Sequence, residues 1–390
     1  MSRLERLWLV AERVAAPFVN QLVLEADEGD LSATDWSAAL AKAAAVTPGA
    51  TLRLRGVLGW TRWTAGGAPV VREVDGSAWS GRDGGGAPFL ARPLDGRAGP
   101  PVELLMVRGP RPRLVLRTAH ALMDGGGARL LAERIAAAAR GEELPPPRFA
   151  PLTDEALARE LGGVAGEPAP PDCPSPLGAA APAPLAVRWA RRTLPEPGRR
   201  LLPRLIGALA AEVPARERAT VRVDVPVDLR RHRPELTLTA NLTGLLRVPA
   251  GALLEGDDPE EAIAAWIGDS LARKDEVRFP LSAPNLRWLP LGLLARAARG
   301  KNAEALAAGR FSTTATVSNL GRMDLSALAA PGFTPRRAFW IPPGSPGLPL
   351  FLTATGGGDG VELCASAPLG LADGGRLEGL LDRLCSTLSA

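Results

Sequence analysis

The chain has 390 residues, 46% of them hydrophobic and 23% charged, with a formal net charge of +4. This length allows two domains of ordinary size, each with its own core, and the composition is that of a soluble globular protein. The mild charge excludes a strongly basic nucleic-acid-binding class, and the arginines are not interleaved with stacking aromatic residues. No apolar stretch is long enough to span a bilayer.

Arginine is concentrated at residues 191–204 and 230–233. A solvated surface accounts for most of these charges, and attraction of a phosphorylated cofactor or an acidic carrier protein is the alternative. Cys173, Cys364 and Cys385 form no CxxC pair and have no neighbouring ligands at metal-binding spacing. We therefore expect no metal site. The N-terminus shows no signal-peptide pattern, which predicts a cytoplasmic protein with reduced thiols.

In the first half of the chain, apolar spacing predicts both helices and strands. A helix that begins near residues 32–35 is expected to end before Pro48-Gly49, a pair typical of a turn. The expected helices cover residues 4–15, 32–44 and 128–140, and the expected strands cover residues 20–26, 102–108 and 113–118.

Residues 145–184 contain three proline clusters, at 145–147, 168–171 and 182–184. Proline interrupts helices and central strands, so this segment is predicted to be an extended crossover over the surface. It divides the chain into an N-terminal half at 1–150, a crossover at 151–185 and a C-terminal half at 186–390. Both halves mix helices with strands, which predicts an α+β fold.

In the second half, apolar and polar residues alternate over 221–227, as in a half-buried strand. Asp258 and Pro259 are typical of the start of a helix, with acidic residues near the positive end of its dipole. Further strands are expected over 313–318, 338–341, 350–355 and 361–367, and a final helix over 377–388.

The chain contains only two histidines, His120 and His232, and imidazole is the usual general base near neutral pH. His232 lies between Arg231 and Arg233, where neighbouring cations lower imidazole basicity. We expect its side chain to be solvated and without a chemical role. His120 is therefore the stronger candidate.

His120 directly follows an apolar strand, so a sheet would fix its position. Asp124 comes four residues later, followed by Gly125, Gly126 and Gly127. A glycine run at a junction between strand and helix allows a tight turn and leaves room for another group to approach. On these residues alone, a hydrogen-bonded core histidine remains the alternative to a catalytic one.

The segment TAHALMDG at residues 118–125 resembles the HxxxDG motif of condensation domains of peptide synthetases, chloramphenicol acetyltransferase, wax ester synthases and polyketide-associated acyltransferases. Three further segments resemble motifs of this superfamily in the same order: PVDLRR at 226–231, ANLT at 240–243 and TVSNLG at 316–321. Residues 17–36 also resemble its opening. Two positions differ, because Ala119 replaces a frequent histidine and Ala240 replaces a glycine.

The resemblance implies two halves, each like chloramphenicol acetyltransferase, that form a V with an active-site tunnel between them. It implies that His120 is the catalytic base and that Asp124 pairs with Arg230 as a structural salt bridge. Gly125 and Gly126 would form the active-site loop. As candidates for tunnel or oxyanion contacts we single out Asn241 and Ser318.

This resemblance predicts a free-standing acyltransferase that forms an ester or amide in secondary-metabolite or lipid biosynthesis. The donor would be an acyl-CoA or a phosphopantetheinyl thioester on a carrier protein, and the acceptor a small molecule with a hydroxyl or an amine. We expect a monomer with no tightly bound cofactor. The alternatives are a non-catalytic module that recruits a partner or carrier protein, and a different His-assisted step such as cyclisation, epimerisation or dehydration.

Overall fold

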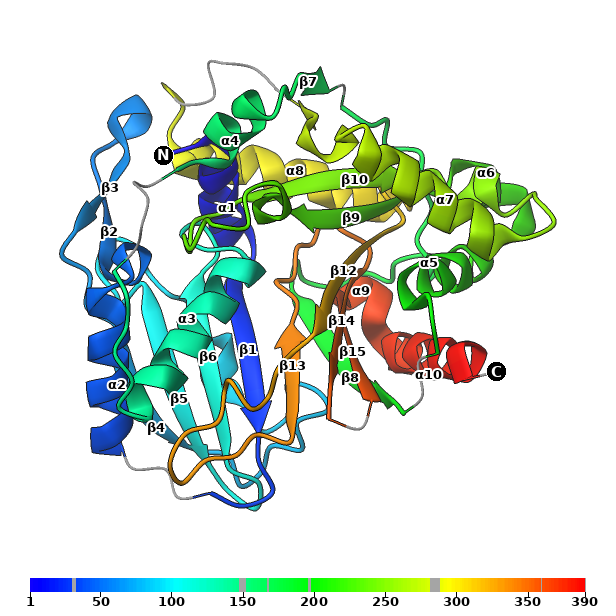
Figure 1. The fold of residues 1–390 in the computed structure, drawn as a ribbon. Coiled ribbons are helices and arrows are strands. Elements are labelled where there is room, and N and C mark those ends of the chain that lie inside the picture. The colour runs from blue at the N-terminus through cyan, green and yellow to red at the C-terminus, as the bar shows by residue number, and fades with distance from the viewer. Residues whose placement is uncertain are drawn as a thin grey trace.

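The computed structural model describes residues 1–29, 33–146, 152–166, 168–195, 198–280, 288–358 and 360–389. Two mixed β-sheets organise this part of the chain, one with five strands and one with six. They lie side by side in Figure 1, and helices cover their outer faces. The α+β fold class predicted from the sequence is confirmed.

The first sheet has the order β13-β1-β6-β5-β4. Helices α2 (Ala33–Ala45) and α3 (Gly125–Ala139) pack on one of its faces around a core that includes Leu22, Leu40, Leu116 and Leu131. The strands are β13 (Arg337–Ile341), β1 (Val19–Glu25), β6 (Arg113–Ala119), β5 (Val102–Arg108) and β4 (Val70–Asp75). A small hairpin, β2 (Leu52–Arg55) and β3 (Arg62–Ala65), lies beside this sheet.

The second sheet has the order β10-β9-β12-β14-β15-β8. Its strands are β10 (Thr243–Val248), β9 (Val223–Asp228), β12 (Ala315–Arg322), β14 (Phe351–Gly357), β15 (Gly360–Pro368) and β8 (Val187–Leu194). Its core is completed by α5 (Leu201–Ala211), α6 (Ala250–Leu253), α7 (Pro259–Ala272), α9 (Leu369–Ala372) and α10 (Arg376–Ser389).

The later part of the chain contributes one strand to the first sheet. β13 comes from the C-terminal part of the sequence, yet it pairs antiparallel with β1 at the edge of the first sheet, with Leu22 opposite Trp340. The segments before and after the proline-rich crossover are therefore interlaced. The division of the chain at 151–185 stays a prediction, and β13 is the strand of the later segment that joins the first sheet.

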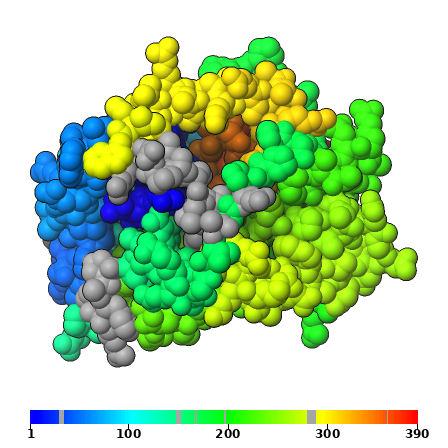
Figure 2. Space-filling model, turned by 90° about the horizontal axis from the view of Figure 1, so that it is seen from above, coloured from blue at the N-terminus to red at the C-terminus, as the bar shows by residue number. Residues whose placement is uncertain are grey.

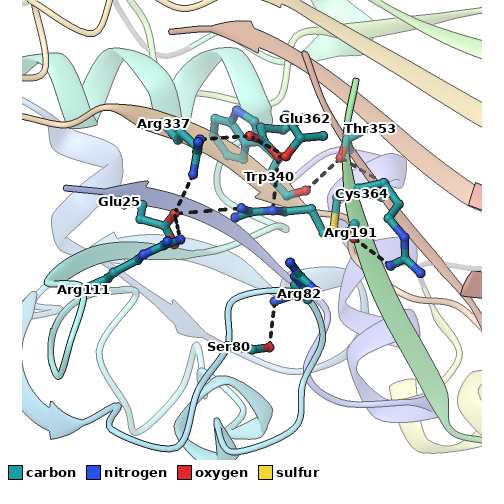
Figure 3. Close-up of polar contacts among 12 residues, drawn as sticks. Glu25, Ser80, Arg82, Arg111, Arg191, Arg337, Trp340, Thr353, Glu362 and Cys364 are labelled. Carbon is teal, nitrogen blue, oxygen red and sulfur yellow. Dashed lines mark hydrogen bonds and ion pairs between the residues drawn. The ribbon is translucent and has the colours of Figure 1, made fainter. Parts of the chain in front are cut away.

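A buried ionic cluster joins the two sheets where this exchanged strand lies (Figure 3). Glu25 at the end of β1 accepts a hydrogen bond from Arg113 at 2.8 Å and lies 3.9 Å from Arg191 of β8. Arg191 in turn lies 3.1 Å from Glu362 of β15. The Arg191 guanidinium also covers the ring of Phe339 in β13, 4.1 Å from its centroid.

A second junction is formed by helix α1 (Arg3–Val14), which begins with a capping box between Ser2 and Glu5. α1 packs against α8 (Leu291–Ala308) through Val10, Val14, Leu291 and Ala295. In the space-filling view from above, the dark blue N-terminal segment and the yellow segment that includes α8 are visible on the same face of the molecule (Figure 2). α1 thus links the first sheet to a helix from the second half of the sequence.

Most of the predicted elements are present, with three corrections. The crossover contains a helix, α4 (Asp154–Glu160), because its prolines flank this segment and Thr153 caps it by accepting from the Ala156 amide. A two-residue strand, β7 (Ala165–Gly166), pairs with β11 (Phe279–Pro280). Helix α3 begins at Gly125, three residues earlier than predicted. The predicted start of the second helix, near residues 32–35, includes residue 32, which lies outside the described residues.

Within the described ranges, no helix combines the length and apolarity needed to cross a membrane. The same ranges contain no group of three His, Cys, Asp or Glu side chains arranged to hold a metal ion. Cys173 and Cys364 are buried free thiols, and burial raises the pKa of both. These cysteines therefore behave as small core residues.

Candidate active site

The candidate active site is centred on the turn that joins β6 to α3. β6 ends at Ala119, His120 follows, and Asp124 is the N-cap of α3. The Nδ1 atom of His120 lies 3.1 Å from the carbonyl oxygen of Met123. A carbonyl can only accept, so Nδ1 carries the proton of the neutral ring and donates to Met123. This tautomer leaves Nε2 with its lone pair, which is the form that a general base needs.

Burial lowers the pKa of His120 from its ordinary value, since a charged imidazolium loses hydration there. Contacts with its own backbone, the Met123 carbonyl, the charge of Asp124 and the Asn241 side chain act in the opposite direction, but they do not outweigh burial. The ring is therefore neutral near pH 7 and able to accept a proton.

Two aromatic side chains pack against the imidazole. The Trp8 ring of α1 is 5.0 Å from the His120 ring, centroid to centroid, and the Phe18 ring is 5.3 Å away, nearly parallel at 11°. Trp8 and Phe18 are themselves 5.2 Å apart. The imidazole thus forms one side of a three-ring cluster.

Asp124 is engaged on both oxygens and makes no hydrogen bond with the His120 ring. Its Oδ1 accepts from the Gly127 amide at 2.7 Å, which caps α3. Its Oδ2 accepts from Arg230 Nη1 at 3.0 Å, from the Leu242 amide at 2.7 Å and from Thr243 Oγ1 at 3.1 Å. This carboxylate therefore ties the start of α3 to the β9–β10 region of the second sheet.

Arg230 completes this tie. Besides Asp124, it donates to Asp228 at 2.9 Å and to the carbonyl oxygens of Leu238 and Ala240 at 2.9 and 2.6 Å. The predicted pair of Asp124 and Arg230 is thus brought together. We name the set of Asp124, Asp228 and Arg230 the Asp124 anchor; its effect on stability stays a prediction.

The glycines after Asp124 serve close packing. A Cβ on Gly126 would lie 2.6 Å from Asp228 Oδ2 and 3.0 Å from Arg230 Nη1, and one on Gly127 would lie 2.2 Å from the Thr239 carbonyl oxygen. Gly125 through Gly127 form the first turn of α3, whereas the sequence suggested a loop. Their lack of side chains lets the helix start approach the second half.

Asn241 contacts the segment of His120 directly. Its Nδ2 donates to the backbone carbonyl of His120 at 2.8 Å, and the residue is buried. Ser318 lies on β12, two residues before Leu320, whose side chain would contact a Cβ on Gly125 at 3.3 Å. In the described part of the chain, no hydrogen bond connects Ser318 with His120 or Asn241.

Comparisons with known proteins identify the fold. No family model and no curated protein matches the sequence. Solved structures do match: the first condensation domain of the CDA synthetase has a TM-score of 0.68 at 19% identity over 100% of this chain and 95% of that chain. The chain has the condensation-domain fold.

Two further condensation-domain structures support this assignment. The starter condensation domain of rhizomide synthetase RzmA, in complex with C8-CoA and Leu-SNAC, has a TM-score of 0.65 at 16% identity, covering 100% of this chain and 93% of that one. The condensation domain of the Monacolin K polyketide synthase MokA has a TM-score of 0.65 at 13% identity, covering 99% and 95%. At these identities the match defines the fold only.

Within this condensation-domain fold, His232 differs from its prediction. It is not a solvated side chain, because its Nε2 lies 2.8 Å from Oε1 of the fully buried Glu276 and only 14% of its side chain is exposed. The sequence suggested cationic neighbours, but the turn at 229–232 directs the ring to a carboxylate from a distant segment. Arg231 lies 3.8 Å from the same oxygen.

Two hollows of about 390 and 520 Å³ lie away from His120. The first is lined by residues of α5, α7 and α10, and the second by Arg322, Asp324 and Arg336. The tunnel between two halves stays a prediction. Sequence reasoning also missed Trp8 and Phe18 as neighbours of His120, since helical periodicity marks Trp8 only as an apolar residue.

Proposed function

We propose that the protein is an acyltransferase that moves an acyl group from a thioester to a hydroxyl or amine, with His120 as general base. The observation that carries this proposal is the His120 tautomer: Nδ1 is held by the Met123 carbonyl at 3.1 Å, which leaves Nε2 as a proton acceptor. The condensation-domain fold agrees with this chemistry.

In the proposed reaction, Nε2 of His120 removes the proton of the acceptor as the acceptor oxygen or nitrogen attacks the thioester carbonyl carbon. A tetrahedral intermediate forms, the carbon–sulfur bond breaks, and the imidazolium returns the proton to the departing thiolate. The base is thus regenerated and no other co-reactant is needed. Holding donor and acceptor together is worth several kcal/mol, about 7–11 in well-oriented systems.

The developing oxyanion needs hydrogen-bond donors. The candidates are the backbone amide near Gly125, the Asn241 side chain and the Ser318 hydroxyl. Asn241 is favoured by position, because one N–H already donates to the His120 carbonyl and the amide carries a second. Ser318 is supported only by its place on β12 near Gly125.

The proposed donor is an acyl-CoA or an acyl group on a carrier protein, with no tightly bound cofactor. The RzmA starter condensation domain, which shares this fold, was solved with C8-CoA, and this supports testing CoA thioesters first. We further propose a monomeric, cytoplasmic enzyme with the division into halves at 151–185. The acceptor is a small molecule.

The test is thiol release from a panel of acyl-CoAs with candidate amines and alcohols, with the products weighed by mass spectrometry. Wild-type protein should release thiol and form the conjugate, and His120→Ala should lose roughly 10²- to 10⁴-fold in rate. His232→Ala is the matched control and should keep its rate. Thiol release unaffected by His120→Ala would contradict the mechanism. No turnover with any CoA donor would shift the test to carrier-bound donors and to the recruitment module.

A further inference from the structure

Two aromatic residues from separate segments meet at the His120 ring. Trp8 lies in the middle of α1, and Phe18 lies just before β1, after the chain has left that helix. Both rings lie close to parallel with the imidazole, at 25° for Trp8 and 11° for Phe18, with centroids 5.0 and 5.3 Å away. Stacked rings at this separation attract each other and resist tilting.

Helix α1 holds both rings. Glu12 follows Trp8 by one helical turn, and its Oε2 accepts the backbone N–H of Phe18. Burial raises the pKa of the Glu12 carboxyl, consistent with a position inside the fold. The opposite contacts of α1, made by Val10 and Val14, pack on α8. The helix is therefore anchored on one side and presents Trp8 to the imidazole on another.

Ordinary core packing does not account for Trp8. It is only half-buried, and it belongs to none of the apolar clusters formed by the described residues. Its ring contacts are with Phe18 and His120. The Nδ1 contact with Met123 fixes one edge of the imidazole. The Trp8 and Phe18 rings are only 5.2 Å apart, so they lie together on one side of the imidazole and restrict it from that side.

We propose that Trp8 and Phe18 are positioning residues that support the His120 ring from one side, and we call this pair together with the Met123 contact the clamp. The pair holds the plane of the ring and shields that side of it from water. This inference rests on the proposed function, in which Nε2 of His120 must point at the acceptor. The pair adds the orientation that hydrogen bonding at Nδ1 alone leaves free, because a ring held at one edge can still swing about that contact. A misplaced base loses rate steeply with distance.

The clamp can be tested without substrate by histidine NMR titration of the intact protein, since the chain has only two imidazoles. A His232→Gln variant assigns the signals. Trp8→Ala should shift the His120 midpoint upward toward the ordinary imidazole range, because water reaches the ring. Trp8→Phe, which keeps a stacked ring, should stay near wild type. Trp60→Ala, which removes an exposed tryptophan, is the matched control and should leave the midpoint unchanged.

A folded Trp8→Ala protein, checked by circular dichroism, with an unshifted His120 midpoint would overturn the clamp. If Trp8→Ala does not fold, Trp8→Leu and Phe18→Leu keep apolar bulk but remove the flat ring, and unshifted midpoints in both would have the same meaning. In thiol release, Trp8→Ala should lose roughly 10- to 100-fold in kcat/KM, whereas Trp8→Phe keeps most of it. Absence of wild-type turnover would count against the proposed function alone, because the titration does not depend on catalysis.

Discussion

Two buried ionic groups join the first sheet to the second, and they are built differently. In the Asp124 anchor, the carboxylate is hydrogen-bonded on both oxygens, at distances of 2.7–3.1 Å. In the cluster of Figure 3, Oε1 of Glu25 faces Arg111, Arg191 and Arg337 at 3.6–3.9 Å. The first group is directional and the second is a looser gathering of charges.

The difference indicates which of the two ionic groups fixes the geometry of the candidate active site. Asp124 caps the helix that follows His120, so the anchor fixes where the His120 segment lies relative to Asn241. In the Figure 3 cluster each carboxylate has several arginines: Glu25 also receives Arg113 at 2.8 Å, and Glu362 also lies 3.8 Å from Arg337. A carboxylate with several arginines keeps a cation when one arginine is removed, whereas Arg230 is the one arginine paired with Asp124 among the described residues.

The largest expected effect is at the anchor. Asp124→Ala or Arg230→Ala should lower the free energy of unfolding by about 3–5 kcal/mol, because each breaks a buried ion pair. Asp124→Ala also removes the cap of α3, and Arg230→Ala leaves the Asp124 carboxylate without a cation. Denaturant unfolding measures this, and Glu73→Ala at the exposed Glu73–Arg108 pair is the control, with a loss of at most about 1 kcal/mol. A variant that keeps wild-type stability but loses activity would show instead that the residue takes part in the reaction.

Gly126→Ala tests the close approach at the same place. The new Cβ would stand 2.6 Å from Asp228 Oδ2, so the anchor must shift, at a cost of about 1–3 kcal/mol in unfolding free energy. Gly268→Ala in α7 is a matched helical control with open space around its Cβ, and it should be neutral or stabilising. Equal stability of the two variants would remove the steric explanation of the glycine run.

Arg191→Met probes the looser junction. Glu25 keeps Arg113 and Glu362 keeps the Thr193 hydroxyl at 3.0 Å, so the expected loss is only about 1–2 kcal/mol. Thermal or denaturant unfolding beside Arg230→Ala gives the comparison directly. A loss at Arg191 as large as that at Arg230 would mean that the two junctions do not differ in the way described.

The smallest effect concerns acid stability and His120. Burial lowers its pKa in the folded state, so on acidification the unfolded chain takes up the proton first. Its contribution to stability is therefore full above the ordinary imidazole pKa of about 6.5 and declines as pH falls below it. His120→Gln should lose less stability than wild type between pH 7 and 5. Identical pH profiles in urea unfolding would contradict a buried neutral ring.

The sequence was sufficient for much of the fold. The strand before His120, the capped helix at Asp258 and the alternating strand β9 all follow local periodicity, and the structure contains them. The exchange of β13 into the first sheet could not be predicted, because pairing between distant strands leaves no mark on local spacing. Helix α4 was not predicted, because the high proline content of residues 145–184 as a whole argued against a helix. The stretch that forms α4 contains no proline itself.

The candidate site was only partly predictable. The family resemblance predicted that Asp124 pairs with Arg230. In the structure, Asp124 Oδ2 lies 3.0 Å from Arg230 Nη1. His232 was wrongly expected to be solvated, because its partner Glu276 is 44 residues away in the sequence. Trp8 and Phe18 contact His120 only in the folded chain. Neither their residue type nor their spacing in the sequence marks them as neighbours of this histidine.

The most direct test of the central claim is the pH dependence of kcat/KM for thiol release in wild type, His120→Gln and His232→Gln. Wild type and His232→Gln should share one acid limb, below the ordinary imidazole range because burial lowers the pKa of His120. His120→Gln should lose roughly 10²- to 10⁴-fold and show no such limb. A wild-type rate and limb in His120→Gln, or loss of the limb in His232→Gln, would contradict the account.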